Sequence, residues 1–197
     1  MLAAEPSGGT ISIKAGGNIE LNGDSPDTLT AIRTADSVTL IAGGSISEGT
    51  HGRIDAASLK TESGTDTSLN GQNRIKSFSG SSTMGDVTLV NTLPLQILGV
   101  TAAGDVIVNN LADVTVGGAD ITSATLVYAP GDVTITAPGF TIIVQGSNTT
   151  AGAGTEVRAD GTVTLNAPQV LVIDGTAPDA LATVVSGSIG GPLAIPD

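Results

Sequence analysis

A short phrase that recurs along the chain limits the folds open to it. Gly85–Leu89 (GDVTL) returns as Gly104–Val108 (GDVIV) after 19 residues (104 − 85), with a third copy from Gly131 and a blurred one from Asp160. Each copy joins a Gly-Asp turn to a short run of β-forming residues, without helical periodicity. Self-similarity at about 20–30 residues is typical of stacked repeats, so the predicted fold class is all-β, a parallel β-helix (β-solenoid). With about 20–25 residues per coil, the chain would form roughly 8–10 coils.

Apolar and polar residues alternate along the strands and identify the side chains that should face the interior. At the start of the chain, Ile11 and Ile13 point to one side and Ser12 and Lys14 to the other. Such alternation marks a strand with one buried face. From Gly85 onward the residues expected inside are Val87, Leu89, Leu95, Ile97, Val106, Val108, Val114, Val116, Ile121, Leu126, Val133, Ile135, Ile142, Val144, Val157, Val163, Leu165, Val170 and Val172.

The repeat pattern divides the chain into three parts. Residues 1–8 are an N-terminal extension, residues 9–175 the repeating body, and residues 176–197 a C-terminal cap or linker. The opening residues lack the basic and apolar regions of a signal peptide, so the chain is expected to be a piece of a longer protein.

Polar stretches inside the body predict interruptions of the strands. The pair Asn70-Gly71 favours a turn. The Ser- and Gly-rich stretch Ser77–Ser82 is expected to be a surface loop. Gly146–Gly154, rich in Gly, Ser and Thr, predicts a loop that bulges from the body.

The composition restricts the kinds of partner. The formal net charge of −12 disfavours nucleic acid and anionic membrane surfaces. No stretch approaches the ~20 apolar residues of a membrane span. The chain has no cysteine, so its stability must come from stacking and not from disulfides. With only two Phe and one Tyr, Val, Ile, Leu and Ala must fill the interior.

Four phrases carry a resemblance to a known family. Gly43–Gly49 (GGSISEG), Arg53–Leu59 (RIDAASL), Leu69–Ile75 (LNGQNRI) and Gly85–Thr92 (GDVTLVNT) resemble repeats of filamentous-haemagglutinin-like exoproteins, which are large bacterial surface proteins secreted by the two-partner route. The resemblance covers about residues 9–175. It implies a right-handed parallel β-helix outside a Gram-negative cell, with adhesion as the commonest role. The family's Asn-Pro-Asn-Gly type secretion motif is not found in this chain, so the chain resembles the repetitive shaft.

The function that this resemblance implies is a structural shaft or adhesive segment of a secreted, extracellular protein, with no enzymatic activity and no cofactor. The implied partners are a host-cell or matrix surface, contacted through the parent adhesin, and an outer-membrane transporter during secretion. The alternative is a glycan-binding or polysaccharide-degrading parallel β-helix protein. An acid cluster beside a groove would favour the alternative, whereas smooth sides and open, stackable ends would favour the shaft.

Three aspartates hold equivalent places in the repeats and are the candidates for a metal site. If the repeats stack in register, Asp86, Asp105 and Asp132 form a column of acids ~5 Å apart. Charges that close require either a cation such as Ca²⁺ or backbone N–H donors. Backbone donors are the favoured interpretation, because the Gly-Gly-x-Gly-x-Asp nonapeptide of calcium-binding repeats is absent. No metal site is therefore predicted, and these three residues stay as the Ca²⁺ candidates.

Other candidates for chemistry are few. An acid-only glycan hydrolase would use Asp105, Asp113 or Asp120. All three lie beside a glycine or at a strand start and are typical of turns, so no catalytic residue is predicted. The only histidine, His51, is expected in an exposed turn and, without cysteine, predicts no zinc site.

Outward threonines suggest one further possibility. Thr88, Thr115, Thr134 and Thr164 could line one flat face, as in ice-binding proteins. Threonine is also a common strand residue on a solvated face. The irregular repeat spacing, 19 and then 27 residues (104 − 85, 131 − 104), favours the second explanation.

Overall fold

The computed structural model describes residues 8–22, 30–49 and 51–189, and the regular elements within them are β-strands. Each strand follows the alternation of apolar and polar residues noted above, with alternate side chains buried. The strands are β1 (Ile11–Ala15), β2 (Ile19–Leu21), β3 (Thr30–Arg33), β4 (Ser37–Ala42), β5 (Ile46–Glu48), β6 (Gly52–Ser63), β7 (Thr67–Ser82), β8 (Val87–Asn91), β9 (Leu95–Thr101), β10 (Val106–Asn110), β11 (Val114–Gly117), β12 (Thr125–Ala129), β13 (Val133–Thr136), β14 (Thr141–Gln145), β15 (Thr155–Asn166), β16 (Gln169–Ile173) and β17 (Ala182–Ile189).

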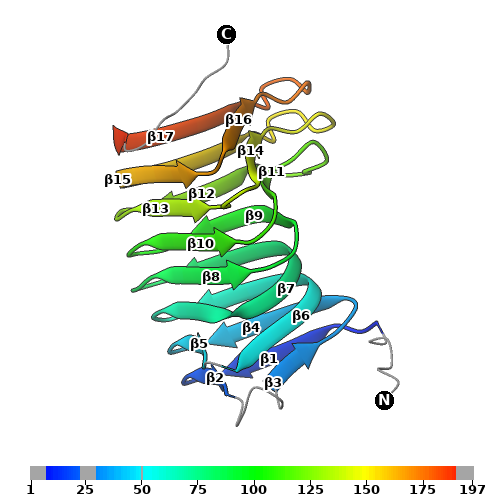
Figure 1. Ribbon diagram of the computed structural model, residues 1–197, viewed down its shortest axis with the longest axis vertical. Helices are drawn as coiled ribbons and strands as arrows, with labels where there is room; N and C mark the ends of the chain where they lie inside the picture. Colours follow the sequence, from blue (N-terminus) through cyan, green and yellow to red (C-terminus); the bar gives the residue numbers. More distant parts are fainter. Residues whose placement is uncertain (1–7, 23–29, 50, 190–197) are drawn as a thin grey trace.

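The strands lie in layers along the long axis of the molecule, in chain order from β1 at one end to β17 at the other (Figure 1). All pairings between the described strands are parallel. The sequence repeats lie one above the next, since Val87 pairs with Val106, Val106 with Val133, and Val133 with Val163.

All 17 strands belong to one sheet, and part of this sheet closes on itself. The closed ring passes through β7, β8, β10, β13, β15, β12 and β9 and returns to β7, while the other strands pair outside it. The sheet is thus a closed seven-strand parallel barrel with extra strands outside. The predicted right-handed parallel β-helix (β-solenoid) of roughly 8–10 coils is wrong on this point.

Two long strands cause the closure. β7 pairs with β8 through residues 67–73 and with β9 through residues 77–81. At the other end of the ring, β15 pairs with β12 through residues 155–159 and with β13 through residues 163–166. Both strands stay extended around a corner where the prediction places a turn between separate faces. Hydrogen bonding therefore joins the two sides of the stack at both ends of the ring.

The interruptions predicted near the middle of the chain are wrong for the same reason. Asn70-Gly71 and Ser77–Ser82 both lie inside β7. Gly71 lets β7 pass close to its neighbour, because a Cβ on Gly71 would lie 2.0 Å from the carbonyl oxygen of Gly52. A close backbone approach, and not a turn, explains this glycine.

One continuous apolar core runs through the stack. Most of the residues expected inside from Gly85 onward are buried, Val87, Val114 and Ile142 among them. Leu126 and Val172 are the exceptions, with 40% and 41% of their surfaces exposed. Leu126 lies between two inward residues of β12, so the alternation itself places it outside.

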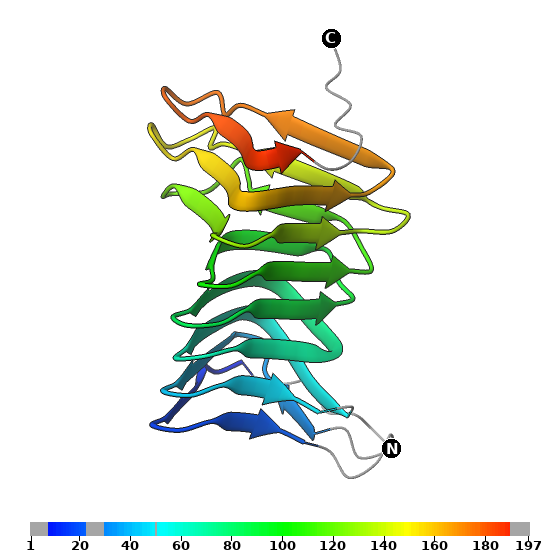
Figure 2. The ribbon, with the colours of Figure 1, turned by 90° about the vertical axis from the view of Figure 1, so that its left-hand side faces the viewer.

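Three loops leave the stack at one corner and lie above one another (Figures 1 and 2). These side loops, residues 118–124, 146–154 and 174–181, follow β11, β14 and β16. The Asn148 N–H donates to the Ala119 carbonyl at 2.7 Å, and the Thr176 N–H donates to Asn148 Oδ1 at 2.9 Å. The predicted Gly146–Gly154 loop is therefore part of a hydrogen-bonded stack of loops.

Candidate functional site

The predicted aspartates form a column at one corner of the stack. Asp86 Oδ1 accepts the backbone N–H of Asp105 at 2.8 Å, Asp105 Oδ1 that of Asp132 at 2.7 Å, and Asp132 Oδ1 that of Thr162 at 2.7 Å. Asp66, which the sequence analysis missed, extends this aspartate column by accepting the Asp86 N–H at 2.9 Å. Each carboxylate thus bonds the layer that follows it in the chain. The donors are backbone groups, as favoured above, but they lie in the next layer and not in the same turn.

The glycine before each later member makes room for this arrangement. A Cβ on Gly104 would lie 2.0 Å from Asp86 Oδ1, and one on Gly131 would lie 2.0 Å from Asp105 Oδ1. No side chain tolerates such a distance. The Gly-Asp phrase therefore recurs because one layer's carboxylate fills the space beside the next layer's backbone.

The Ca²⁺ candidates Asp86, Asp105 and Asp132 are brought together only as this column. Each uses Oδ1 to accept a backbone N–H, which already relieves the repulsion between stacked carboxylates. Across residues 8–22, 30–49 and 51–189, no three His, Cys, Asp or Glu side chains are grouped so as to hold a metal ion.

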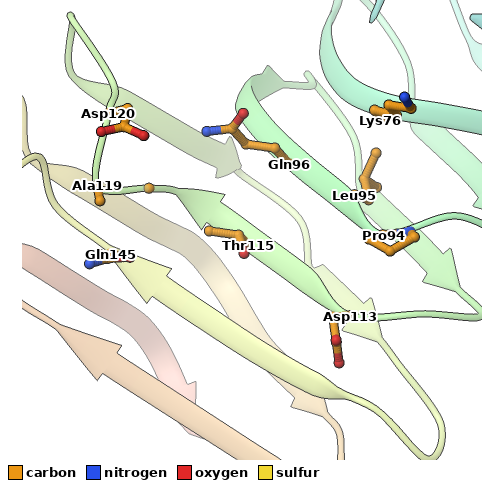
Figure 3. Close-up of a pocket in the computed structure, with 10 residues that line it drawn as sticks. Lys76, Pro94, Leu95, Gln96, Asp113, Thr115, Ala119, Asp120 and Gln145 are labelled. Atoms are coloured by element: carbon orange, nitrogen blue, oxygen red, sulfur yellow. The ribbon is translucent and has the colours of Figure 1, made fainter. Parts of the chain in front are cut away.

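A shallow hollow of about 280 Å³ lies on the outer face of β9, β11 and β14 (Figure 3). This lateral hollow brings together two of the three hydrolase candidates, Asp113 and Asp120, while Asp105 lies in the aspartate column. Figure 3 shows the two carboxylates at opposite ends of the hollow. The remaining lining residues are Lys76, Pro94, Leu95, Gln96, Thr115, Gly118, Ala119 and Gln145.

The chemistry of the lateral hollow suits contact with a polar ligand better than catalysis. Asp113 Oδ1 accepts the Thr141 N–H at 2.9 Å, and the Gln96 side-chain amide donates to the Gly117 carbonyl at 2.9 Å. Asp113 and Asp120 are both exposed. Glycoside hydrolases instead place one of two facing carboxyls in a water-poor pocket.

A buried polar ladder is the main feature that the sequence analysis missed. Asn73, Asn91 and Asn110 are fully buried at another corner. The Ile75 N–H donates to Asn91 Oδ1 at 2.8 Å, and the Asn91 amide donates to Asn110 Oδ1 at 2.9 Å. These amides satisfy backbone groups where the chain turns inside the core. A hint lay in the spacing of Asn91 and Asn110, 19 residues (110 − 91), which equals the repeat.

Glu48 lies at the N-terminal end of this ladder and is 7% exposed. Its Oε2 accepts the Asn73 side-chain amide at 2.9 Å and the Gly71 N–H at 3.0 Å, while Oε1 is buried without a partner. Burial raises the pKa of the Glu48 carboxyl above its ordinary value, and the hydrogen bonds from Asn73 and Gly71 oppose that rise.

Two further candidates from the sequence fall elsewhere. His51 is half-buried in a turn before β6 and belongs to no metal-binding group within the described parts of the chain. Thr88, Thr134 and Thr164 stand in one column, but Ile107 interrupts it and Thr115 belongs to another face. The four threonines therefore do not form one flat array.

One aromatic contact lies on the outer face of β12 and β15. The Arg158 guanidinium lies 5.5 Å from the centre of the Tyr128 ring, and the Tyr128 hydroxyl donates to Asp160 at 2.9 Å. That hydrogen bond to a carboxylate raises the pKa of Tyr128. The group pins two neighbouring layers together on the surface.

Comparison with family models, with curated proteins and with solved structures finds no match to this chain. Among the residues that the structure describes, no helix has the length and apolar character needed to cross a membrane. The proposals below therefore rest on the residues and their geometry.

Proposed function

We propose that the chain is a structural shaft or adhesive segment of a secreted bacterial surface protein, as its resemblance to filamentous-haemagglutinin-like repeats implies. In this role it would present its sides to a host-cell or matrix surface through the parent protein. An outer-membrane transporter would be its partner during secretion, and its place of action would be extracellular.

The aspartate column is the observation that carries the proposal. From Asp66 to Thr162, each layer is tied to the next by a carboxylate that accepts a backbone N–H at 2.7–2.9 Å. Hydrogen bonds to an ionised acceptor are stronger than neutral ones. The most regular acidic residues of the chain thus hold layers together, which serves the stiffness that a shaft requires.

A glycan-binding or polysaccharide-degrading protein is the alternative, and the lateral hollow is the feature that favours it. The hollow carries two carboxylates, one lysine and two amides on the outer face of three neighbouring strands. Such groups can contact sugar hydroxyls, but the exposure of both acids weakens the case for hydrolysis.

The two functions separate in one experiment. The purified chain is incubated with a panel of acidic and neutral polysaccharides and with matrix proteins, with and without Ca²⁺, and both bound protein and newly released chain ends are measured. We expect no release of chain ends. Release that disappears in the double variant Asp113→Asn/Asp120→Asn would overturn the proposal and make the hollow a catalytic site. The matched control is Asp174→Asn, an exposed acid outside the hollow.

A further inference from the structure

The core of the stack is incompletely covered at both ends. Inward residues of the first layer, such as Ile11 and Ile13, are only partly buried, and so are Val170 and Val184 of the last layers. Residues at equivalent positions inside the stack, such as Leu40 and Val157, are fully buried. Large exposed apolar side chains also gather near the C-terminal end, at Val172, Ile173, Leu181 and Val185.

The end strands also have an unpaired edge. Among the described pairings, β1 pairs only with β4 and β2 only with β5, while β16 pairs only with β14 and β17 only with β15. An open edge carries backbone N–H and C=O groups that can pair with another strand. A partner must supply parallel strands in order to continue this sheet.

The register shows that the two ends of this chain match each other. One unbroken column of paired residues runs from Ile13 through Leu40, Thr61, Gly80, Val100, Val127 and Val157 to Val184. A second runs from Ile19 through Ile46, Thr67, Val87, Val106, Val133 and Val163 to Ile189. The next layer beyond β17 would therefore be occupied correctly by β1 and β2 of another copy.

Charge favours contact between opposite ends over contact between like ends. Residues 1–76 contain six Lys and Arg and nine Asp and Glu, a net charge of −3 (6 − 9). Residues 77–197 contain one Arg and ten Asp and Glu, a net charge of −9 (1 − 10). Two C-terminal ends would repel each other more than a C-terminal and an N-terminal end.

From these observations we infer that the chain associates head to tail with a second copy of itself, with β17 of one copy pairing in parallel with β1 and β2 of the next. The contact covers Ile13 with Val184 and supplies the missing partner for both strand edges. Because it joins two different surfaces, the association does not close as a dimer, and it adds further copies as concentration rises.

Two end-blocking variants provide the first test, by sedimentation velocity over a range of concentrations. Ile13→Lys blocks the N-terminal end, and Val184→Lys blocks the C-terminal end. A lysine at either position would be buried unpaired in the joint, so each variant alone should associate about a hundredfold more weakly than the wild-type chain. An equimolar mixture should still form a 1:1 dimer, because each variant keeps one intact end.

Each other outcome contradicts the inference. A wild-type chain that stays monomeric at all concentrations overturns it. Self-association that survives in Ile13→Lys alone shows that like ends meet. A mixture that stays monomeric, although circular dichroism shows both variants folded with wild-type melting temperatures, shows that the two ends do not fit each other.

A charge-reversal pair tests the register without altering the core. The column Lys14, Ile41, Glu62, Ser81, Thr101, Tyr128, Arg158 and Val185 places Val185 of one copy beside Lys14 of the next. Both side chains are exposed, so their substitution should leave folding intact. Val185→Lys should weaken association about two- to fivefold, and adding Lys14→Glu should restore it. Equal weakening by both single variants, with no rescue in the double variant, excludes this register.

Discussion

The lower and upper layers of the molecule make the same corner in different ways. In β6, β7 and β9 the chain passes around it as one strand, and only Gly99 bends, with φ of 144°. Above β9 the chain leaves the stack at that corner as the side loops between β11 and β12, β14 and β15, and β16 and β17 (Figure 1). The repeat length follows the difference. It is 19–21 residues between Ile46 and Val106 (67 − 46, 87 − 67, 106 − 87) and 26–30 residues between Val106 and Ile189 (133 − 106, 163 − 133, 189 − 163).

This difference shows that pairing between layers does not depend on how the corner is made. The column from Val87 to Val163 keeps its register although the third and fourth repeats are longer than those before them. Extra residues are accommodated where they leave the sheet, since a longer surface loop adds only a small entropic cost. The interior of the corner is therefore the constrained part, and four substitutions examine it.

Phe78→Ala should have the largest effect. Phe78 is 1% exposed, lies just past the continuous corner of β7, and is the largest fully buried side chain. Its removal leaves a cavity that the surrounding strands cannot fill, at a cost of about 3–5 kcal/mol in unfolding free energy. Urea denaturation followed by circular dichroism measures the loss. The matched variant in the upper layers is Ile142→Ala, for which about 2–5 kcal/mol is expected. A larger loss for Ile142→Ala would show that the upper layers are the more tightly packed.

Asn91→Ala should come next. It removes the acceptor for the Ile75 N–H and the donor to the Leu93 carbonyl and to Asn110 inside the core. Leaving these groups unpaired should lower the unfolding free energy by about 2–4 kcal/mol in the same assay. The exposed neighbour Asn109 is the control, and Asn109→Ala should change stability by less than about 0.5 kcal/mol. Equal effects would mean that the buried ladder contributes nothing particular to the lower layers.

Gly99→Ala tests the bend that separates the two kinds of corner. Its φ of 144° is one that side chains rarely adopt, so strain of about 1–3 kcal/mol is expected, although the nearest atom to an added Cβ, the Leu126 carbonyl oxygen, is 3.7 Å away. Thermal denaturation by calorimetry would show the lower melting temperature. Gly16→Ala, where no atom lies within 4 Å of the added Cβ, serves as the control and should be neutral. An unchanged melting temperature for Gly99→Ala would mean that β9 can bend without glycine.

Glu48→Gln should have an effect that depends on pH. Because the pKa of Glu48 is raised in the folded chain, its contribution to stability is full below the unfolded value and is lost as pH rises through the folded value. The wild-type chain should therefore lose stability relative to Glu48→Gln as pH rises above about 4.5. Unfolding free energies measured from pH 4 to pH 8 give the difference. Glu156→Gln, in the upper layers, is the comparison variant, and a parallel response in both would show that burial of Glu48 is not the cause.

The sequence alone predicted part of this structure well. Alternation placed residues such as Val106 and Ile135 in the core, because one face of each strand is buried. The phase of the repeats brought Asp86, Asp105 and Asp132 to one column. Asp66 was missed because one residue, Thr65, separates it from its glycine.

The rest depended on long-range contacts that single-sequence patterns do not contain. Asn73 and Asn91 favour turns by local propensity, yet here their amides satisfy buried backbone groups at a corner. The same applies to Ser77–Ser82, whose small polar residues favour a loop but which pairs on both sides within the sheet. The closure of the ring follows from such segments, so the expected fold class failed where polar residues were buried. The lateral hollow combines residues from β7 to β14 and had no pattern in the sequence.

The bonds of the aspartate column all run in one direction. Each carboxylate belongs to the earlier layer and accepts an N–H from the later one. A chain that emerges from synthesis or export N-terminus first therefore presents, at every step, a finished row of acceptors to the segment that follows. Assembly by this route is templated, with each layer acting as the mould for its successor, and a chain of low aromatic content can build a long core without collapsing around a single nucleus.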